Sequence, residues 1–393
     1  MNTQTIRFDT DGWHAIMDDA VTVPNVTRIA QAFVRYFALH CSGNTHTIAI
    51  GYDGRRNSRQ YASLVAEILA SHGYDVRLSS NIIPTPILSY AVKHEGCGAG
   101  IMITAGAHPH QYTGIKFRAS DGGPFTSGEL KKIEEQMRAD VESVDPDAPL
   151  MCPEVESVQL GSARIRACDF VPAYVEQLKR LVDFSALKEF AESASNHAAV
   201  MIDSMGGAGG TLLEDLLAES GWRAQTLFGT PDAEFFGRLP EPVSNNLEPL
   251  HYNVEVTDAL FGLATDGDAG RCGVVYDDGK LMDASELVLA VARHLREDKH
   301  WTGGIVATAS ITDSLLLIAE HWGIPLYATD NGFAGITEIM HARDCMVGGD
   351  GEGGLAYKSH IPDRDAILTG LFLAEIIAKS GKSLRAIVAG MRA

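Results

Sequence analysis

The sequence lacks the features that would place the protein in a membrane. No run of about 18 apolar residues occurs anywhere in the 393 residues, and a membrane-spanning helix needs roughly that length. The opening residues 1–7 have no apolar signal core. We therefore expect a cytoplasmic protein that does not bind membranes.

Paired cysteines are also missing. The six cysteines are scattered along the chain and form no C-x-x-C pair, the spacing typical of structural zinc sites. We expect reduced thiols in the core of a cytoplasmic protein and no zinc ion. The cysteines are Cys41, Cys97, Cys152, Cys168, Cys272 and Cys345.

Basic residues are scarce relative to acidic ones. The chain has 32 lysines and arginines against 51 aspartates and glutamates, which gives a formal net charge of −19. Nucleic acids and anionic membranes bind surfaces with clustered lysine and arginine, so this balance argues against both as partners. It allows a small anionic ligand, because such a ligand needs only a few local cations.

The sequence does contain a regular alternation of strand-like apolar runs and amphipathic helical runs. Its length of 393 residues allows two to four domains of roughly 100–200 residues each. Strand, helix, strand order predicts mostly parallel sheets covered by helices. The pattern restarts twice, so we expect three α/β units, with a loop at 145–149 before the second. The expected strands include 47–51, 75–78, 100–104, 198–203 and 304–307.

One loop carries a recognisable pattern. Residues 104–116 read T-A-G-A-H-P-H-Q-Y-T-G-I-K. They resemble the active-site loop T-A-S-H-N-P-x-x-Y-x-G-x-K of the α-D-phosphohexomutases, the family of phosphoglucomutase and phosphomannomutase. In a gapless alignment the family's phosphorylated serine falls on Gly106, its histidine on Ala107 and its asparagine on His108. Glycine has no hydroxyl, so the loop keeps its frame without the family's nucleophile.

Other segments extend the resemblance over nearly the whole chain. They are FDTDGW (8–13), which is similar to the family's opening, GYDGRR (51–56), DSMGGAGG (203–210) and SGKSL (380–384). The glycine run in the third of these lacks the G-x-G-x-x-G order, so we expect no nucleotide cofactor.

The resemblance implies three similar phosphohexomutase-type α/β domains with mixed, mostly parallel sheets. The domains are expected at 1–150, 151–272 and 273–393, the last ending in a C-terminal helix. The family's fourth domain, which carries the substrate-phosphate loop, is expected to be absent.

Residues 266–271 (DGDAGR) resemble the family's metal loop, D-G-D-x-D-R. In the family, three aspartates and a phosphoserine oxygen hold Mg²⁺, a hard cation that prefers oxygen ligands. Here the third aspartate is Gly270 and the serine is missing. We expect Asp266 and Asp268 to bind Mg²⁺ weakly, completed by water or a substrate phosphate, or not at all. If no metal binds, these aspartates would cap a turn or pair with Arg271.

Residues 348–354 (GGDGEGG) lie where the family has its sugar-hydroxyl loop, G-G-E-x-S-G-G. Asp350 falls on the family's glutamate and Glu352 on its serine. Carboxylates accept hydrogen bonds strongly, which suits sugar hydroxyls, so we expect both to bind substrate. The alternative is a flexible glycine loop with solvated acids. Arg271 and Arg55 keep family positions and are also expected to contact substrate.

The active-site loop retains a lysine and gains two histidines. The resemblance places Lys116 near the reacting centre, in an acid–base role if its pKa is lowered, or in neutralising phosphate. His108 and His110 could act as general base or phosphoryl acceptor, and a histidine pKa near neutrality suits proton transfer. The alternative is that both are polar loop residues that fill space. His14 and Ala334 replace two cations of the family, which weakens the support for a phosphoryl group.

Together these features predict a phosphohexomutase-like protein without the standard mutase chemistry. The preferred interpretation is a repurposed enzyme that acts on a sugar phosphate, a nucleotide sugar or a related polyol phosphate through His108, Lys116 and His110. The alternative is a non-catalytic protein that binds such a ligand or a partner protein. The third is an ordinary phosphoglucomutase or phosphomannomutase. Loss of the fourth domain would uncover apolar surface, so we also expect a homo-oligomer, most simply a dimer.

Overall fold

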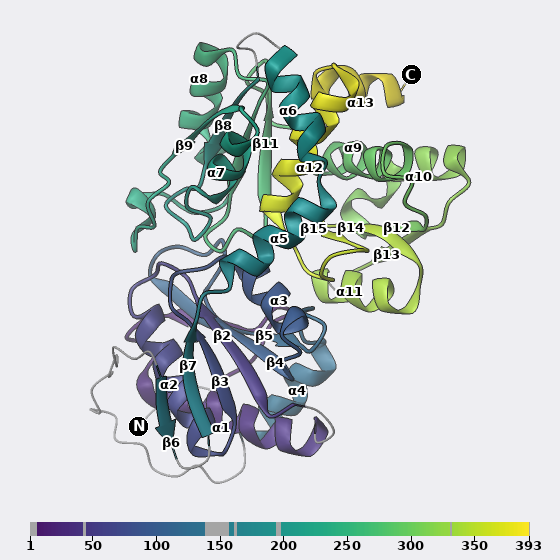
Figure 1. Cartoon of the computed structure of the whole chain (residues 1–393). Coiled ribbons are helices and arrows are strands. Elements are labelled where there is room, and N and C mark those ends of the chain that lie inside the picture. Colours follow the sequence, from purple (N-terminus) through teal and green to yellow (C-terminus); the bar gives the residue numbers. More distant parts are fainter. Residues whose placement is uncertain are drawn as a thin grey trace.

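The computed structural model describes residues 6–41, 45–137, 157–160, 163–193, 198–330 and 332–392. Within them, three sheets flanked by helices follow one another along the chain (Figure 1). The prediction of three mostly parallel α/β units is therefore confirmed. The loop expected at 145–149 lies outside the described residues.

The first sheet has seven strands in the order β1-β5-β4-β2-β3-β7-β6. Strands β2, β3, β4 and β7 run parallel, whereas β1, β5 and β6 are antiparallel to their neighbours. Since β6 and β7 belong to it, the sheet extends beyond the boundary expected at residue 150. The strands are β1 (Trp13–Ile16), β2 (Thr47–Tyr52), β3 (Asp75–Ser79), β4 (Ala99–Ile103), β5 (Tyr112–Ala119), β6 (Ser157–Leu160) and β7 (Ala163–Cys168). The helices of this unit are α1 (Val23–His40), α2 (Ser58–Ser71), α3 (Thr85–His94) and α4 (Ser127–Gln136).

The second sheet has four strands in the order β11-β10-β8-β9. Three of them run parallel and the edge strand β11 is antiparallel. Because β11 pairs with β10 as far as Tyr276, the unit continues past the boundary expected after residue 272. The strands are β8 (Ala199–Asp203), β9 (Arg223–Leu227), β10 (Phe261–Thr265) and β11 (Cys272–Tyr276). The helices are α5 (Val171–Leu181), α6 (Phe184–Ser193), α7 (Leu212–Glu219), α8 (Glu248–Thr257) and the short η1 (Phe235–Gly237) and η2 (Ser244–Asn246).

The third sheet repeats this design in the order β13-β12-β14-β15, again with one antiparallel edge strand, β15. The strands are β12 (Gly304–Thr308), β13 (Leu326–Thr329), β14 (Cys345–Gly349) and β15 (Leu355–Tyr357). The helices are α9 (Ala284–Glu297), α10 (Ala309–Trp322) and α11 (Gly332–Ala342).

The local sequence explains why these elements form. Strand β4 (AGIMI) is buried along its whole length, as expected for a parallel strand with helices on both faces. Helix α9 begins at a capping box made by Asp283 and Glu286, and α4 begins at one made by Thr126 and Glu129. In each box the two side chains accept hydrogen bonds from backbone N–H groups that the first turn leaves free.

Helix α12 (Ala366–Ser380) joins the second and third units. Every residue from 366 to 377 is buried, and the helix contacts α6, α7 and α9 (Figure 1). A Cβ on Gly370 would lie 2.6 Å from Leu213 Cδ2 and 3.1 Å from Leu263 Cδ1, so glycine permits this close approach. Helix α13 (Leu384–Arg392) follows it. A helix that is apolar around most of its circumference, as α12 is, fixes the two units against each other.

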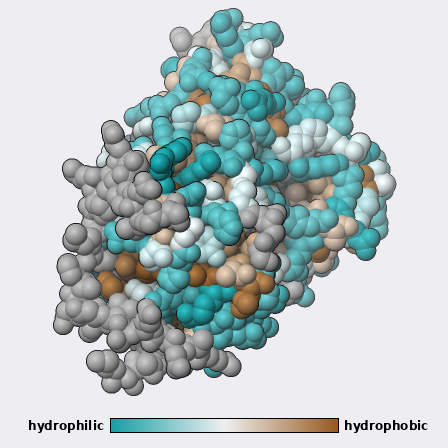
Figure 2. Space-filling view, turned by 60° about the horizontal axis from the view of Figure 1, so that its bottom comes forward, coloured by the Kyte–Doolittle hydropathy of each residue, from teal (hydrophilic) through white to brown (hydrophobic). Residues whose placement is uncertain are grey.

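The face shown in Figure 2 is mostly hydrophilic, with hydrophobic atoms in scattered patches. None of the described helices has the length and apolar character needed to cross a membrane. Among the described residues, Leu316 and Leu317 are adjacent exposed apolar side chains on α10. The expected homo-oligomer stays a prediction.

The loops that follow β4, β10 and β14 meet between the three units. Each loop lies at the carboxyl end of its strand, the end at which α/β sheets usually bind ligands. Gly267 lies against the backbone of Gly106, and Arg271 forms an isolated bridge with Gly354. The fold therefore brings together the three loops that the sequence motifs singled out.

Candidate functional site

A cavity of about 440 Å³ lies where the three loops meet. All three units line it, including Leu239 and Glu241 of the second unit, which no sequence motif indicated. Of the residues expected in the site, Arg55, His110 and Asp350 do not line the cavity. The charged or imidazole side chains in its wall are Asp9, Asp11, His14, His108, Lys116, Arg118, Glu241, Asp266, Asp268, Arg271, Glu352, Asp363 and Arg364.

Arg55 binds the backbone of the 104–116 loop. Its side chain is fully buried and forms an ion pair with Asp53 at 3.0 Å. Its two NH groups donate to four loop carbonyls at 2.7–2.9 Å, those of Gly106, His108, Pro109 and Tyr112. The position gives Arg55 a structural role, and its expected contact with substrate stays a prediction.

Gly106 faces the metal-like loop. Its φ of +54° lies in the left-handed region, which glycine adopts without strain. A Cβ at this position would lie 3.2 Å from Lys116 Nζ, 3.6 Å from Asp268 Oδ1 and 3.7 Å from Asp266 Oδ2. The place where the family has its serine therefore points at the lysine and both aspartates.

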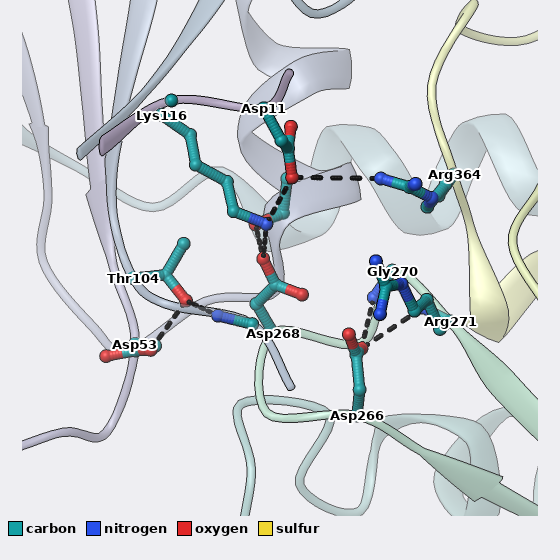
Figure 3. A network of polar contacts seen from close by, with 12 residues as sticks. Asp11, Asp53, Thr104, Lys116, Asp266, Asp268, Gly270, Arg271 and Arg364 are labelled. Atoms are coloured by element: carbon teal, nitrogen blue, oxygen red, sulfur yellow. Dashed lines mark hydrogen bonds and ion pairs between the residues drawn. The ribbon is translucent and has the colours of Figure 1, made fainter. Parts of the chain in front are cut away.

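Lys116 is a buried cation between two acids. Its Nζ lies 2.8 Å from Asp11 Oδ2 and 3.0 Å from Asp268 Oδ2, as Figure 3 shows. Burial acts to lower the pKa of Lys116, but Asp11 and Asp268 outweigh it and raise the pKa above its usual value. Acid–base catalysis by Lys116 would need a lowered pKa. The geometry instead favours the other expected role, neutralisation of phosphate charge.

Asp266 and Asp268 are held differently. Asp266 Oδ1 accepts from the backbone N–H groups of Gly270 at 2.9 Å and Arg271 at 3.1 Å, so this side chain does cap the turn (Figure 3). Asp268 Oδ2 accepts from Thr85 Oγ1 at 2.7 Å as well as from Lys116. Burial and the adjacent charge of Asp268 raise the pKa of Asp266.

The two aspartates supply only part of a Mg²⁺ shell. Among the described residues, no group of three or more histidine, cysteine, aspartate or glutamate side chains is arranged to hold a metal ion. Asp268 Oδ1 and Asp266 Oδ2 do converge near Gly106, since a Cβ at that position would lie within 3.7 Å of both. Water or a phosphate would have to complete the six oxygen ligands that Mg²⁺ prefers.

Asp11 connects this network to two arginines, Arg118 and Arg364. Asp11 Oδ2 lies 3.7 Å from an Arg364 NH group, and Asp11 Oδ1 lies 3.6 Å from Arg118. Arg118 Nε also pairs with Asp363 at 2.7 Å. Burial opposes ionisation of Asp11, yet Lys116, Arg118 and Arg364 together hold its pKa far below the usual range.

Asp11, Arg118 and Arg364 differ in how far the sequence could predict their place in the site. Arg118 is two residues from Lys116 on β5, and alternate residues of a strand share a face. Asp11 lies in the opening motif. Arg364 had no sequence signal, because the approach of α12 to the cavity decides its position.

The glycine loop of the third unit contributes one acid to the cavity. Glu352 lines it and pairs with an Arg271 NH group at 2.6 Å. Asp350 is buried and accepts from Arg364 Nε at 2.9 Å and from the backbone of Glu352 and Gly354. Its hydrogen bonds thus position Arg364, and its expected contact with a sugar stays a prediction.

The histidines occupy different environments. His108 is exposed, lines the cavity and stacks on Tyr112 with ring centroids 5.2 Å apart. Partial burial and nearby positive charge, chiefly at His14 and Arg55, lower the pKa of His108 to about 4. The expected pKa near neutrality is therefore wrong for His108, which is a neutral imidazole at pH 7. His110 is half-buried and lies outside the cavity wall.

His14 forms a separate pair with Asp9. Its Nδ1 lies 3.1 Å from Asp9 Oδ2, and only 6% of its side chain is exposed. Its ring lies 5.2 Å from that of His108. The position that carries an arginine in the family resemblance thus holds a buried, acid-bound imidazole.

Comparison with known proteins covers all three units. The chain matches the family models of phosphoglucomutase/phosphomannomutase α/β/α domain I over residues 5–143, domain II over 172–279 and domain III over 283–393. It is 28% identical over 377 residues to a probable phosphoglucosamine mutase of Methanobrevibacter smithii, covering 95% of this chain and 76% of that protein. It is also 28% identical over 384 residues to a phosphoglucomutase/phosphomannomutase of Thermococcus kodakarensis, covering 97% and 79%.

Solved structures agree. The crystal structure of a phosphomannomutase candidate from Thermus thermophilus is 31% identical and superposes with a TM-score of 0.86. The match covers 99% of this chain and 83% of that one.

Proposed function

Since the chain belongs to the phosphoglucomutase and phosphomannomutase family, we propose that it is an enzyme that acts on a hexose phosphate bound in the cavity. It does so without a serine nucleophile in the 104–116 loop. The observation that carries the proposal is the position of Gly106. Its missing side chain points at Lys116, Asp266 and Asp268, so the frame of a phosphoryl-transfer site is present without a hydroxyl.

The cations of the cavity come from every unit that meets there. Lys116 and Arg118 lie on β5, Arg271 is the last residue of the metal-like loop, and Arg364 precedes α12. Arginine suits phosphate because its planar fork can donate two parallel hydrogen bonds. Arg271 is the most accessible of the four, with 24% of its side chain exposed.

Phosphate binding also requires additional positive charge. Seven acidic side chains line the cavity against four cationic ones. The excess of negative side chains would repel a phosphate dianion unless a proton or a cation neutralises part of this charge. A proton on Asp266, whose pKa is raised, is one source. Mg²⁺ is the other: bound by Asp266, Asp268 and the phosphate itself, it would neutralise the charge of the ligand.

The test measures binding and turnover separately. Calorimetric titrations with glucose 1-phosphate, mannose 1-phosphate and glucosamine 6-phosphate, with and without Mg²⁺, should detect binding that strengthens when the metal is present. Arg271→Met should weaken it at least about tenfold, since a hydrogen bond to a charged group contributes about 1.5–3 kcal/mol. Lys188→Met is the matched control, because this side chain is exposed and remote from the cavity.

Each outcome decides between the alternatives. Binding with conversion of the sugar phosphate supports the proposal. Binding without any conversion would favour a protein that only binds such ligands. No binding of any probe, or equal losses in Arg271→Met and Lys188→Met, would overturn the assignment of the cavity.

A further inference from the structure

We propose that the imidazole of His108 replaces the missing serine and accepts the phosphoryl group of a hexose phosphate bound in the cavity. The inference rests on the proposed function and deepens it by naming the acceptor and the intermediate, a phosphohistidine. Histidine is one of the side chains that form covalent intermediates in enzymes.

The loop places His108 close to the vacated position. His108 lies two residues beyond Gly106, and its ring is exposed to the cavity. Its backbone N–H donates to Ala105 O at 3.1 Å, and its carbonyl accepts from Arg55 at 2.8 Å. The same guanidinium donates to Gly106 O at 2.7 Å. One buried arginine therefore fixes the backbone both at Gly106, where the family has its serine, and at His108, the proposed acceptor.

The ring itself is supported on two sides. It stacks on Tyr112 with an angle of 18° between the planes, and His14 lies beside it, held in turn by Asp9. Within the described part of the chain, neither ring nitrogen of His108 has a hydrogen-bond partner. Since its pKa is lowered to about 4, the ring keeps a free lone pair at neutral pH.

Most other nucleophilic groups near the cavity are less suited to the role. The hydroxyls of Thr85 and Thr104 donate to Asp268 and Asp53, at 2.7 and 2.6 Å, so both are bound to acids. Thr10 also lines the cavity, and because phosphothreonine is stable in acid, the labelling experiment distinguishes it from His108. His14 is almost fully buried, and its Nδ1 is bound by Asp9. No cysteine, serine or tyrosine lines the cavity among the residues that the structure describes.

The transfer would proceed in two balanced steps. In the first, a lone pair of the His108 ring attacks phosphorus and the nitrogen–phosphorus bond forms. The phosphorus–oxygen bond to the sugar breaks, and the sugar oxygen leaves with the electron pair and takes a proton from water. In the second, a sugar hydroxyl or a water molecule attacks phosphorus, its proton passes to solvent, and the imidazole leaves with its electron pair. Lys116 and Arg364 would neutralise the phosphoryl oxygens in both steps.

The experiment looks for the covalent intermediate. The full-length protein is incubated with glucose 1-phosphate, glucose 1,6-bisphosphate, mannose 1-phosphate or glucosamine 6-phosphate and quenched in alkali. Mass spectrometry of intact protein and peptides then locates any phosphoryl group. A phosphohistidine survives alkali and is lost in acid, whereas phosphoserine and phosphothreonine show the opposite pattern. We expect an acid-labile phosphoryl group on His108.

The variants separate this inference from the proposed function. His108→Asn should abolish the label while binding of the probes, measured by calorimetry, stays within about threefold. His72→Asn, an exposed histidine at the end of α2, should keep the label. Probes that bind or are converted without labelling His108, or a label on another residue, would overturn the inference but leave the function standing. If no probe binds at all, the proposed function fails first and the inference fails with it.

Discussion

Replacing Arg55 by lysine tests whether this residue organises the active-site loop, because the change keeps the charge and reduces the donors. The guanidinium of Arg55 uses all five of its N–H groups, one on Asp53 and four on loop carbonyls. Lysine has only three N–H groups, so at least two of these acceptors must lose their partner.

The expected cost follows from this count. A buried acceptor left without a partner costs about 1–3 kcal/mol, so two of them destabilise the closed loop by roughly 2–6 kcal/mol. A cost of about 2 kcal/mol corresponds to a roughly thirtyfold increase in the fraction of molecules in which this loop is open, at about 1.4 kcal/mol per tenfold. The ion pair with Asp53 should survive in Arg55→Lys, so we expect the rest of the fold to remain intact.

Hydrogen–deuterium exchange of peptides that cover residues 104–112 measures this opening directly. Arg55→Lys should exchange in this loop at least about thirtyfold faster than the wild type. Arg56→Lys is the matched control, since Arg56 is 54% exposed and its ion pair with Asp18 is worth only about 0–1 kcal/mol.

Unchanged exchange in Arg55→Lys would refute this reasoning. If the variant instead bound hexose phosphates less tightly with the loop still protected, the contact with substrate expected from the sequence would be right. The two readouts therefore separate a positioning residue from a binding residue.

Two substitutions and one pH series test the electrostatics of the cavity. In the folded state the pKa of Asp266 is raised, so its protonated form stabilises the fold at low pH, and this contribution is lost as the pH rises through the folded pKa. Asp266→Asn keeps the acceptor for the turn but does not titrate. The thermal midpoint of the variant should therefore rise relative to that of the wild type as the pH increases from 4 to 8, and a difference that stays constant over this range would contradict the prediction. Gly270→Asp should retain Mg²⁺ after dialysis, because its Cβ would lie 3.4 Å from Asp268 Oδ1, whereas metal analysis of the wild type should find little without a phosphate ligand. Labelling of His108 should be nearly independent of pH above about 5 and fall toward pH 4, in keeping with its pKa of about 4, and a midpoint near 6.5 would show that the ring is not held as described. Light scattering at tens of micromolar checks the expected homo-oligomer, and a clean monomer mass would remove that expectation.

Much of the fold could be predicted from the sequence alone. The run TIAIG at 47–51 is buried strand β2, and the strand expected at 304–307 is β12, because continuous apolar runs between glycine and polar turns suit buried parallel strands. The boundaries were less predictable. Strand β7 joins the first sheet through pairing with β3, which lies nearly ninety residues earlier, and such non-local pairing leaves no mark on local periodicity.

The candidate site divides in the same way. The sequence by itself determined which loop would form the site, that Gly106 carries no nucleophile there, and that only two aspartates remain at 266–271. These points follow from the sequence because they depend only on which side chain stands at each position of a motif.

Only the tertiary structure decided what those side chains do. Lys116 and Asp268 are 152 residues apart, yet their contact decides between the two roles expected for the lysine, because it raises the pKa and favours a permanent cation over an acid–base group. The contacts of Arg55 with the 104–116 loop and of Arg364 with Asp11 likewise depend on tertiary packing. The physical reason is that the energy of a charge depends on its neighbours within a few ångströms, and the fold alone sets which neighbours those are.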